Sequence, residues 1–402
     1  MRTGTKPKIL VVGAGIAGSL AVSGLAERQD IELICLERAA EADQLDAGTG
    51  LNIGPNAIKA LAAIMPERAR TLVDNSLPWK QWTVELTDGS PLMHLELATV
   101  ADNAGIRIRW AELYALLRRP IARHIRFGTE LTSIDHDDEG LFVDVQDASG
   151  VAGKRISGID LIIAADGRYS VARQTQWGHE PPNFLGVCLY RLLVPAGTDC
   201  PIDDYGQWFN GPNRLLAFRV PGDFVYIAGS FPIPADSTVP ETAKQGPTLR
   251  GLYTPQNGSL TAQTRFLVHA VEAHADRIHW ARLQDGTVQF AGPPGVLLLG
   301  DAAHPMVPTL GQGATQSVED ACVLVDEVRR ALDRGERLDL VPARVEARRR
   351  ERVELVVSLS RAATDTMLEG ADPVAGTLKK TQPAFLRQLE RLYRDVPRPR
   401  HD

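Results

Sequence analysis

Three glycines and an acid near the start of the chain have types and spacing that could bind a nucleotide. Gly13, Gly15 and Gly18 have GxGxxG spacing after the apolar run KILVV, and Glu37 stands about twenty residues further on. In such a unit the glycines permit a tight turn, room for a pyrophosphate, and close packing of helix on strand. The free N–H groups of the helix N-terminus would bind the phosphates, and Glu37 would accept the ribose hydroxyls. The pattern predicts an adenine dinucleotide site, and a plain βαβ unit without ligand is the alternative.

Two further apolar runs end in an acid. DLIIAADGRYSVAR places Asp166 before Gly167, with Ser170 and Arg173 beyond it, and GVLLLGDAAHP ends in Asp301. Ligands of parallel sheets bind beyond the carboxyl ends of the strands. These acids are therefore predicted to lie near the dinucleotide.

A parallel sheet is the element that would bring these residues together. KILVV, IELICL, DLIIAA and GVLLL are short apolar runs typical of strands buried on both faces. ATQSVEDACVLVDEVRRAL, after the Asp301 loop, repeats its apolar residues at helical spacing. Two other segments, 79–97 and 186–231, alternate apolar and polar residues, and LLAFRVPGDFVYIAGSF indicates a hairpin turning at Pro221-Gly222-Asp223. They predict a largely antiparallel second sheet.

Composition excludes several classes of protein. The 402 residues are 44% hydrophobic and 23% charged with a net charge of −6, so nothing favours a nucleic-acid partner. The four cysteines form no CxxC pair, which predicts neither a metal site nor a disulfide framework. No apolar run approaches the length of a membrane span, and the glycine spacing explains the apolar N-terminal run better than a signal peptide does. We expect a cytoplasmic protein; its oligomeric state stays open.

Three motifs in order resemble the single-component (group A) FAD-dependent aromatic hydroxylases, the monooxygenase family related to p-hydroxybenzoate hydroxylase. They are GAGIAG with Glu37-Arg38, Ala165-Asp166-Gly167 with Ser170 and Arg173, and GDAAHPMVPTLGQG at 300–313. DAGTGLNIGPNAIKAL at 46–61 is similar to the family's loop and helix beside the flavin. The resemblance runs from about residue 8 to residue 335.

The resemblance implies FAD in extended form, with Asp301 on the ribityl chain and Asp166 near the pyrophosphate and the passage used by NADH or NADPH. Pro305 and Pro308 would stiffen the loop beside the flavin, and Gly311 and Gly313 would let the backbone approach the ring edge. No catalytic side chain is assigned, because the flavin carries the chemistry and the Pro308 loop would line its face. The predicted cofactor-binding residues are Gly13, Gly15, Ile16, Ala17, Gly18, Glu37, Arg38, Gly50, Arg109, Asp166, Asp301, Pro308, Gly311, Gly313, Ala314 and Thr315.

The chain departs from the family at one arginine. Many members carry His-Arg-x-x-Leu with the arginine near the FAD phosphates, whereas this chain has Trp110 at that position. Adjacent helix residues point about 100° apart, so a neighbouring arginine does not replace it automatically. Either Arg109 or Arg107 reaches the phosphate or the contact is absent, and we favour Arg109.

By resemblance the substrate pocket lies between the antiparallel sheet and the flavin. Candidates for its walls are Tyr190, Arg191, Trp208 and Phe218, with Phe209 and Tyr226 as further possibilities. Arg191 could hold a carboxylate or a phenolate. Taken singly, an aromatic residue in a sheet belongs more often to the core, and an arginine more often to the surface.

The expected architecture is α/β: a Rossmann-like FAD-binding domain with an inserted, mostly antiparallel β-sheet substrate domain and C-terminal helices. The expected division is 1–76 with 101–178 and 277–334 for the FAD-binding domain, 77–100 with 179–276 for the substrate domain, and 335–402 for the helical region. A second hairpin is expected from ELTSIDHDDEG and LFVDVQD, within the FAD-binding domain.

The expected function is NAD(P)H- and O₂-dependent hydroxylation of a small electron-rich aromatic or heteroaromatic compound through a flavin C4a-hydroperoxide. Three alternatives remain: a related FAD oxidase, epoxidase or halogenase, a non-catalytic flavin-binding redox sensor, and an NAD-only dehydrogenase. The last does not explain the Asp301 loop, and WKQW at 79–82 is not the halogenase signature W-x-W-x-I-P. The substrate and the choice between NADH and NADPH are not given by any motif.

Overall fold

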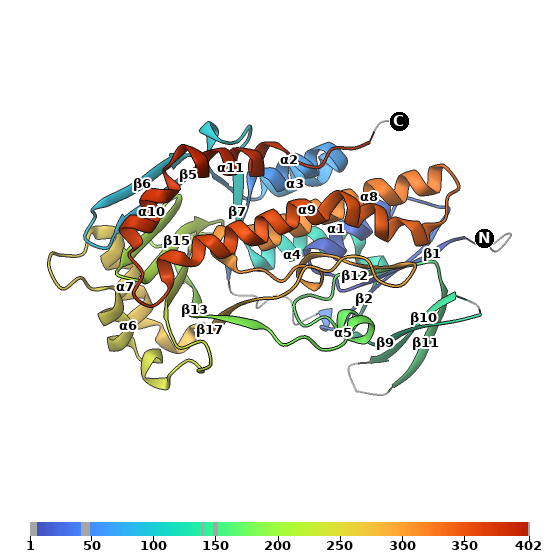
Figure 1. The fold of residues 1–402 in the computed structure, drawn as a ribbon, viewed down its shortest axis with the longest axis horizontal. Coiled ribbons are helices and arrows are strands. Elements are labelled where there is room, and N and C mark those ends of the chain that lie inside the picture. Colours follow the sequence, from blue (N-terminus) through green and yellow to red (C-terminus); the bar gives the residue numbers. More distant parts are fainter. Residues whose placement is uncertain (1–5, 42–48, 139, 148–151, 401–402) are drawn as a thin grey trace.

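The computed structural model describes residues 6–41, 49–138, 140–147 and 152–400. A five-stranded parallel sheet with the strand order β18-β12-β1-β2-β8 forms the centre of one half of the molecule (Figure 1). Its strands are β1 (Lys8–Val12), β2 (Glu32–Glu37), β8 (Ile125–Phe127), β12 (Leu161–Ala164) and β18 (Val296–Leu298). The four apolar runs predicted as buried parallel strands are therefore confirmed, and their carboxyl ends share one edge.

Helices pack on this sheet because small side chains allow close approach. A Cβ on Gly24 of α1 would lie 2.4 Å from Val325 of α8, so these two helices touch at this glycine. Helices of this half are α1 (Ile16–Leu25), α2 (Pro55–Ile64), α3 (Pro66–Asp74), α4 (Trp110–Arg118), α5 (Val171–Trp177) and α8 (Gln312–Asp333). The helix predicted after the Asp301 loop is α8.

A seven-stranded sheet with the order β17-β13-β16-β15-β14-β5-β6 forms the other half, and only its β14–β5 pair is parallel. Its strands are β5 (Gln81–Leu86), β6 (Pro91–Glu96), β13 (Asn183–Pro195), β14 (Tyr205–Asn210), β15 (Asn213–Val220), β16 (Phe224–Pro232) and β17 (His279–Asp285). The hairpin predicted at 221–223 is the β15–β16 connection. Helices α6 (Gly246–Tyr253) and α7 (Ala262–Ala273) cover one face, where they share an apolar cluster with the sheet.

Two three-stranded sheets complete the β structure. One joins β3 (Gly50–Ile53), β7 (Gly105–Arg109) and β4 (Leu77–Trp79), and the other joins β9 (Thr129–Asp137), β10 (Gly140–Asp147) and β11 (Ala152–Ile159). The hairpin expected within the FAD-binding domain is the β9–β10 pair.

Two strands cross the domain boundaries expected from the sequence. β17 pairs with β13 of the large sheet although it lies after the boundary at residue 276, and β4 pairs with β7 although it lies after the boundary at residue 76. The apolar pattern of neither strand predicts the strand with which it pairs. The remaining domain division stays a prediction.

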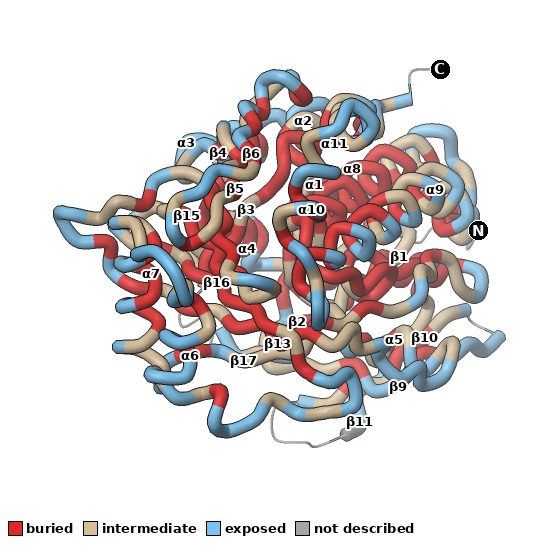
Figure 2. The backbone as a smooth tube through the Cα atoms, turned by 60° about the vertical axis from the view of Figure 1, so that its left-hand side comes forward, coloured by how far each residue is buried: buried red, intermediate tan, exposed pale blue. Residues whose placement is uncertain are grey.

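The C-terminal part is helical: α9 (Val341–Ala362), α10 (Pro373–Lys380) and α11 (Pro383–Arg394). Figure 1 shows α9 running alongside α8, and Figure 2 shows the buried backbone concentrated along α1, α8, β1 and β16. Short 3-10 helices are Leu97–Thr99, Arg119–His124, Glu241–Lys244, Ala275–Arg277, Gly300–Ala302, Pro308–Leu310, Leu338–Leu340 and Ala363–Met367. Within the described ranges, no helix is both long enough and apolar enough to span a bilayer.

Candidate functional site

The first part of the site is a cleft of about 210 Å³ at the carboxyl edge of the parallel sheet. Gly13 and Gly15 line it after β1, Glu37 and Arg38 at the end of β2, and Asp166 after β12. These residues are distant in sequence and meet because their strands are parallel neighbours.

Two of the three glycines of the turn leave no room for a Cβ. Gly13 has a φ of +90°, and a Cβ on it would lie 2.4 Å from the carbonyl oxygen of Ala165. A Cβ on Gly18 would lie 1.9 Å from the carbonyl oxygen of Gly13, whereas a Cβ on Gly15 would meet nothing nearer than 3.9 Å. The N-terminus of α1 is thus pulled against the sheet while its backbone at Gly15 stays open to the cleft. Gly18 packs behind the turn and does not line the cleft.

Glu37 is held by an arginine that the sequence analysis missed. Its Oε2 accepts from Ala14 N at 2.9 Å and lies 3.3 Å from Arg118 Nη2, while Arg118 Nε donates to Ala14 O at 2.6 Å. The Arg118 guanidinium also lies 4.1 Å from the ring centroid of Tyr114. Arg118 lines the cleft from the last turn of α4, two turns after the position where the family arginine was expected.

Arg109, which the sequence analysis favoured for a phosphate, lies elsewhere. It is not among the residues that line the cleft or the cavity beside it. Its guanidinium donates to Glu112 at 2.6 Å and lies 4.9 Å from the Phe224 ring of the large sheet. Arg107 is buried and donates to Pro78 O at 3.0 Å. Both residues belong to β7 and share one face of it, where Arg107 also contacts Asp203 and Arg109 contacts Phe224.

Asp166 lies in the loop after β12 and is partly buried. Burial raises the pKa of its carboxyl, and hydrogen bonds from Ser170 Oγ at 2.6 Å and Ala172 N at 3.1 Å oppose that rise. Ser170 also accepts from Arg173 N and so caps α5. The acid therefore fixes the loop that carries Gly167 and Tyr169 along the cleft.

A second cavity of about 510 Å³ continues from the cleft, with Gly15, Tyr114, Ala165, Gly167 and Tyr169 lining both. Its cofactor-side wall contains predicted residues from α1, β3 and the Asp301 loop. They are Ile16, Ala17, Gly50, Asp301, Pro308, Gly311, Gly313 and Ala314. Residues 46–48 of the predicted flavin-side segment lie outside the described residues.

The loop from Asp301 to Gly313 has the geometry that its prolines and glycines predict. Gly311 adopts a left-handed φ of +63°, and a Cβ on it would lie 2.8 Å from the Asn52 amide. Asp301 lies 3.7 Å from Arg168, which also donates to Gln284 O and Met306 O at 2.9 Å. Thr315 turns away from the cavity, because its Oγ1 accepts from Gly54 N at 2.9 Å.

The opposite wall of the cavity is one face of the seven-stranded sheet. Alternate residues of neighbouring strands form it: Leu189, Arg191, Tyr205, Arg214, Leu216, Tyr226 and Ala228. Of the predicted wall residues, Arg191 and Tyr226 line the cavity, whereas Tyr190, Trp208 and Phe209 do not. Tyr190 and Trp208 do not face it at all. They point to the other face, where Tyr190 Oη donates to Tyr253 Oη at 2.9 Å and Trp208 Nε1 donates to Glu85 at 3.0 Å. Phe218 is on the same face, stacked on Tyr205 with ring centroids 5.7 Å apart, but it does not line the cavity.

Comparison with known proteins gives the site its class. A family model described as FAD binding domain matches residues 260–360. The 3-amino-4-hydroxybenzoate 2-monooxygenase PtnB3 of Streptomyces platensis is 30% identical over 340 residues, which are 80% of this chain and 79% of that protein. The 6-hydroxynicotinate 3-monooxygenase of Bordetella bronchiseptica is 26% identical over 79% of this chain and 82% of its own. This chain belongs to the FAD-dependent aromatic monooxygenases.

The fold of this monooxygenase agrees with solved structures. Klebsiella pneumoniae HpxO, crystallised with FAD and uric acid, superposes with a TM-score of 0.77 at 21% identity, covering 96% of each chain. Pseudomonas aeruginosa PqsL, crystallised with 2-aminobenzoylacetate, superposes with a TM-score of 0.76 at 19% identity, covering 93% of this chain and all of that chain. The predicted family, fold class and FAD cofactor are thus confirmed.

The geometry of this monooxygenase fits an extended FAD. The cleft is narrow and runs past the helix N-terminus, Glu37 and Arg118, and it opens into the larger cavity beside Asp301 and Gly311. The turn at Gly13 and the loop at Gly311 both tolerate no Cβ, as expected where backbone must approach a ligand closely. An adenosine end and a ring end can therefore be accommodated in one continuous space.

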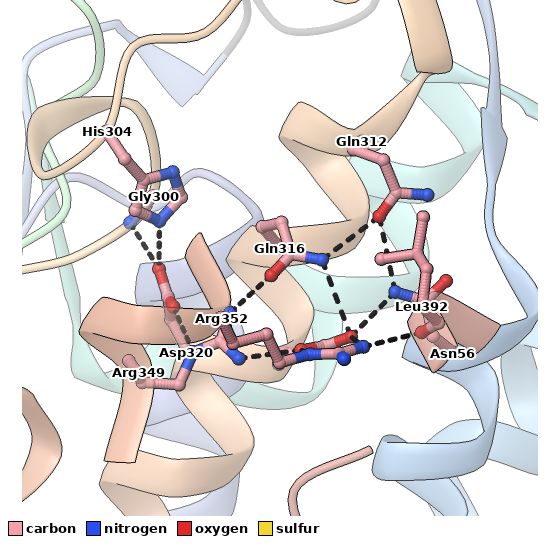
Figure 3. Close-up of polar contacts among 10 residues, drawn as sticks. Asn56, Gly300, His304, Gln312, Gln316, Asp320, Arg349, Arg352 and Leu392 are labelled. Carbon is pink, nitrogen blue, oxygen red and sulfur yellow. Dashed lines mark hydrogen bonds and ion pairs between the residues drawn. The ribbon is translucent and has the colours of Figure 1, made fainter. Parts of the chain in front are cut away.

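A buried polar network holds the Asp301 loop of the monooxygenase against α8 and α9 (Figure 3). Asp320 Oδ2 accepts from Gly300 N at 2.9 Å and lies 2.6 Å from His304 Nε2. Arg349 of α9 donates to Asp320 Oδ1 at 2.7 Å and to Glu319 at 2.6 Å. All four side chains of this network, His304, Glu319, Asp320 and Arg349, are fully buried. The contact between His304 and Asp320 ties the loop to α8.

The network predicts a stability change in acid. Burial alone would raise the pKa of Asp320, but the charges of His304 and Arg349 and the hydrogen bonds lower it to about 2. An unfolded aspartate titrates near pH 4, so the ionised carboxylate contributes stability above pH ~4 and loses it as pH falls toward 2. The contribution is on the order of 2 kcal/mol. We expect the free energies of unfolding of the wild type and Asp320→Asn to converge as pH is lowered from 5 to 2, measured by urea titration. A constant difference would contradict the assignment.

Proposed function

We propose that this monooxygenase hydroxylates a small electron-rich aromatic or heteroaromatic compound with NADH or NADPH as reductant. The single observation that carries the proposal is the cavity of about 510 Å³ between the Asp301 loop and the sheet. Tyr205 and Tyr226 line it together with Leu189, Leu216 and Leu283, which gives apolar walls suited to a ring. The relatives named above act on hydroxylated or amino-substituted rings, which supports this substrate class.

The cofactor would be held by the predicted residues that line the cleft and cavity, with Arg118 added. Glu37 would receive the adenosine ribose, the α1 N-terminus at Gly15 the pyrophosphate, and Asp301 the ribityl chain. When bound and reduced by a nicotinamide nucleotide, FAD would supply the activation of O₂. Gly18 and Thr315 would act indirectly, by fixing the turn and the α8 N-terminus.

The protein itself would position the cofactor and the substrate, stabilise developing charge and exclude water from the cavity. The N-terminus of α8 reaches the cavity at Gly313 and Ala314, so its free N–H groups and dipole would stabilise negative charge at that end. Burial raises the pKa of Tyr205 to about 12, which keeps its hydroxyl protonated and able to donate. The apolar walls would exclude water, which otherwise competes with transfer of oxygen to the ring.

Substitutions of two arginines test whether Arg109, as predicted from the sequence, or Arg118, as proposed here, contacts the FAD phosphates. Arg118→Met removes the hydrogen bond to Ala14 O and the charge beside Glu37, so we expect FAD affinity to fall about tenfold, the scale of a charge-assisted hydrogen bond. Arg109→Met is the matched control, because its partners are Glu112 and Phe224, and we expect FAD affinity to change less than about threefold. Quenching of FAD fluorescence measures both. A larger effect of Arg109→Met would return the phosphate contact to that residue.

The test of function uses the purified, FAD-loaded protein. NADH and NADPH oxidation would be followed with a panel of hydroxylated benzoates, pyridines and quinolones, and products would be weighed by mass spectrometry. We expect one ring compound to accelerate oxidation and to gain one oxygen atom. Oxidation that yields only H₂O₂ with every compound would point instead to an oxidase, and bound FAD without any oxidation would point to a redox sensor.

A further inference from the structure

The cleft and the larger cavity meet at a passage, which we call the neck. Five residues line both spaces and therefore form it: Gly15, Tyr114, Ala165, Gly167 and Tyr169. Three of the five are glycine or alanine, so the two tyrosines supply every side chain longer than a methyl group. Any ligand that extends from the cleft into the cavity must pass these two rings.

Tyr114 is the firmly packed member of the neck. It belongs to α4, and its ring lies 5.0 Å from the ring of Trp110 and 4.1 Å from the guanidinium of Arg118. The three residues are spaced four apart, so they form one stripe along the helix. Trp110 lines the cavity at one end of this stripe, and Arg118 lines the cleft at the other. The Tyr114 ring is thus fixed by neighbours on its own helix.

The hydroxyl group of Tyr114 is available to a ligand. It makes no hydrogen bond with any described residue, and its oxygen is accessible. Burial raises the pKa of the phenol, so the hydroxyl is protonated at neutral pH and can donate. The charges of Glu37 and Asp301 also act on this phenol. It therefore lies within electrostatic range of the acids proposed for the adenosine ribose and for the ribityl chain.

Tyr169 is the loosely held member of the neck. It lies in the loop after β12, two residues beyond Gly167, whose φ is +82°, and it is 68% exposed. Its ring contacts no aromatic ring and no cation among the described residues. Its Oη accepts one hydrogen bond, from Gln284 Nε2 at 3.2 Å. An exposed side chain held in this way can change rotamer rapidly.

The hydrogen bond between Tyr169 and Gln284, which we call the latch, joins the two halves of the molecule. Gln284 belongs to β17 of the seven-stranded sheet, whereas the loop of Tyr169 follows a strand of the parallel sheet. Both residues line the larger cavity, and both also line a further cavity of about 130 Å³. Tyr169 therefore stands between the neck and this further cavity.

Resting on the proposed path of FAD through the cleft and the cavity, we propose that Tyr114 and Tyr169 clamp the middle of the cofactor. Tyr114 is fixed and donates its hydroxyl to a pyrophosphate oxygen beside the α1 N-terminus at Gly15. Tyr169 is movable: its ring covers the cofactor on the solvent side, and the latch to Gln284 keeps it closed. The cofactor enters and leaves when the latch opens.

The first test separates the latch from the ring. Release of FAD would be followed by the rise in flavin fluorescence after dilution of the FAD-loaded protein, and uptake by its quenching. We expect Tyr169→Phe and Gln284→Met each to raise both rates about threefold, the scale of an exposed hydrogen bond, and to leave Kd within about twofold. The double variant should match either single variant, because both remove the same hydrogen bond. Additive effects would overturn the latch.

The second test removes the covering ring and the donor hydroxyl in turn. We expect Tyr169→Ala to release FAD about tenfold faster than the wild type, because it loses the aromatic contact as well as the latch. Tyr114→Phe keeps the ring, and we expect its FAD affinity to fall about tenfold, the scale of a hydrogen bond to a charged group. Unchanged FAD release by Tyr169→Ala, or unchanged affinity of Tyr114→Phe, would overturn the clamp.

His179→Ala is the matched control for the tyrosine substitutions. His179 also lines the further cavity, and it makes no hydrogen bond with any described residue. We expect this variant to take up and release FAD at the wild-type rates. An acceleration equal to that of Tyr169→Ala would mean that any change near the further cavity loosens FAD, and it would overturn the role of the ring.

These measurements use oxidised FAD without a reductant, so they do not depend on turnover. Altered FAD rates in a protein that hydroxylates no ring compound would leave the clamp standing and reject the proposed function. Hydroxylation of a ring compound, with wild-type FAD rates in every tyrosine variant, would do the reverse. Tyr169 is exposed and Tyr114→Phe keeps the ring, so both variants are expected to fold, and their thermal unfolding curves check this.

Discussion

Replacing Arg349 with Met is expected to lower the free energy of unfolding by about 3 kcal/mol or more, because it leaves two buried carboxylates without their shared cation. Arg349 is fully buried between Glu319 and Asp320, at 2.6 and 2.7 Å, and also donates to Gln316. The side chain of Arg352 still pairs with Glu319 in the variant, which limits the loss. Urea unfolding followed by circular dichroism measures the change.

The neighbouring arginine is the control for that experiment. Arg350 pairs with Glu346 and Glu354 on the partly exposed side of α9, where ion pairs contribute little. We expect Arg350→Met to change the free energy of unfolding by less than about 1 kcal/mol. Equal effects of the two substitutions would mean that the network in Figure 3 does not hold α8 and α9 together.

Replacing Gly18 with Val is expected to abolish FAD binding, with an affinity loss of about a hundredfold or more. The first added carbon would already lie 1.9 Å from Gly13 O, so α1 must move away from the turn whose backbone faces the cleft. Helix displacement would disturb the N-terminus and the contact of Ala14 N with Glu37 together. The FAD content of the purified variant and a fluorescence titration with FAD measure the loss.

Gly251 provides the matched control for that glycine. It also lies in a helix, α6, and a Cβ added to it would meet no atom within 4 Å. We expect Gly251→Ala to retain full FAD content and to change stability only slightly. Retention of FAD by Gly18→Val would reject the proposed geometry of the turn.

The sequence predicted those parts of the site that depend on backbone geometry. The turn at Gly13, the acid Glu37 after the second strand and the loop at Gly311 each need a particular residue type at a fixed distance from a strand end. Such requirements are local, so they leave a readable spacing in the chain. The parallel sheet was also predictable, because short apolar runs are typical of strands buried on both faces.

The substrate wall was predicted less well because its residues are selected by sheet parity. Tyr190 and Arg191 are neighbours on β13, yet one packs against Tyr253 in the core while the other lines the cavity. A shift of one residue moves every side chain to the other face, and the aromatic pattern on both faces gave no means of choosing. No motif in the sequence predicts that Arg214 lines the cavity. Its buried Nε without an acceptor is visible only in the structure.

Arg118 was missed for a different reason. The family carries its arginine at the start of the helix, whereas here the Arg118 guanidinium reaches Ala14 O and Glu37 from the end of α4. Two helical turns separate the two positions, and α4 packs so that Arg118, and not the residue at its start, lines the cleft. An arginine near a helix C-terminus is common for dipole reasons alone, so its residue type gave no warning.

Isotope labelling would show whether the oxygen atom gained by the product comes from O₂. The FAD-loaded protein would be turned over with NADH or NADPH and the accelerating ring compound under isotopically heavy O₂, and the product would be weighed by mass spectrometry. The account predicts one heavy oxygen atom on the ring in each product molecule. A ring product without heavy oxygen, formed while NAD(P)H is consumed, would contradict it.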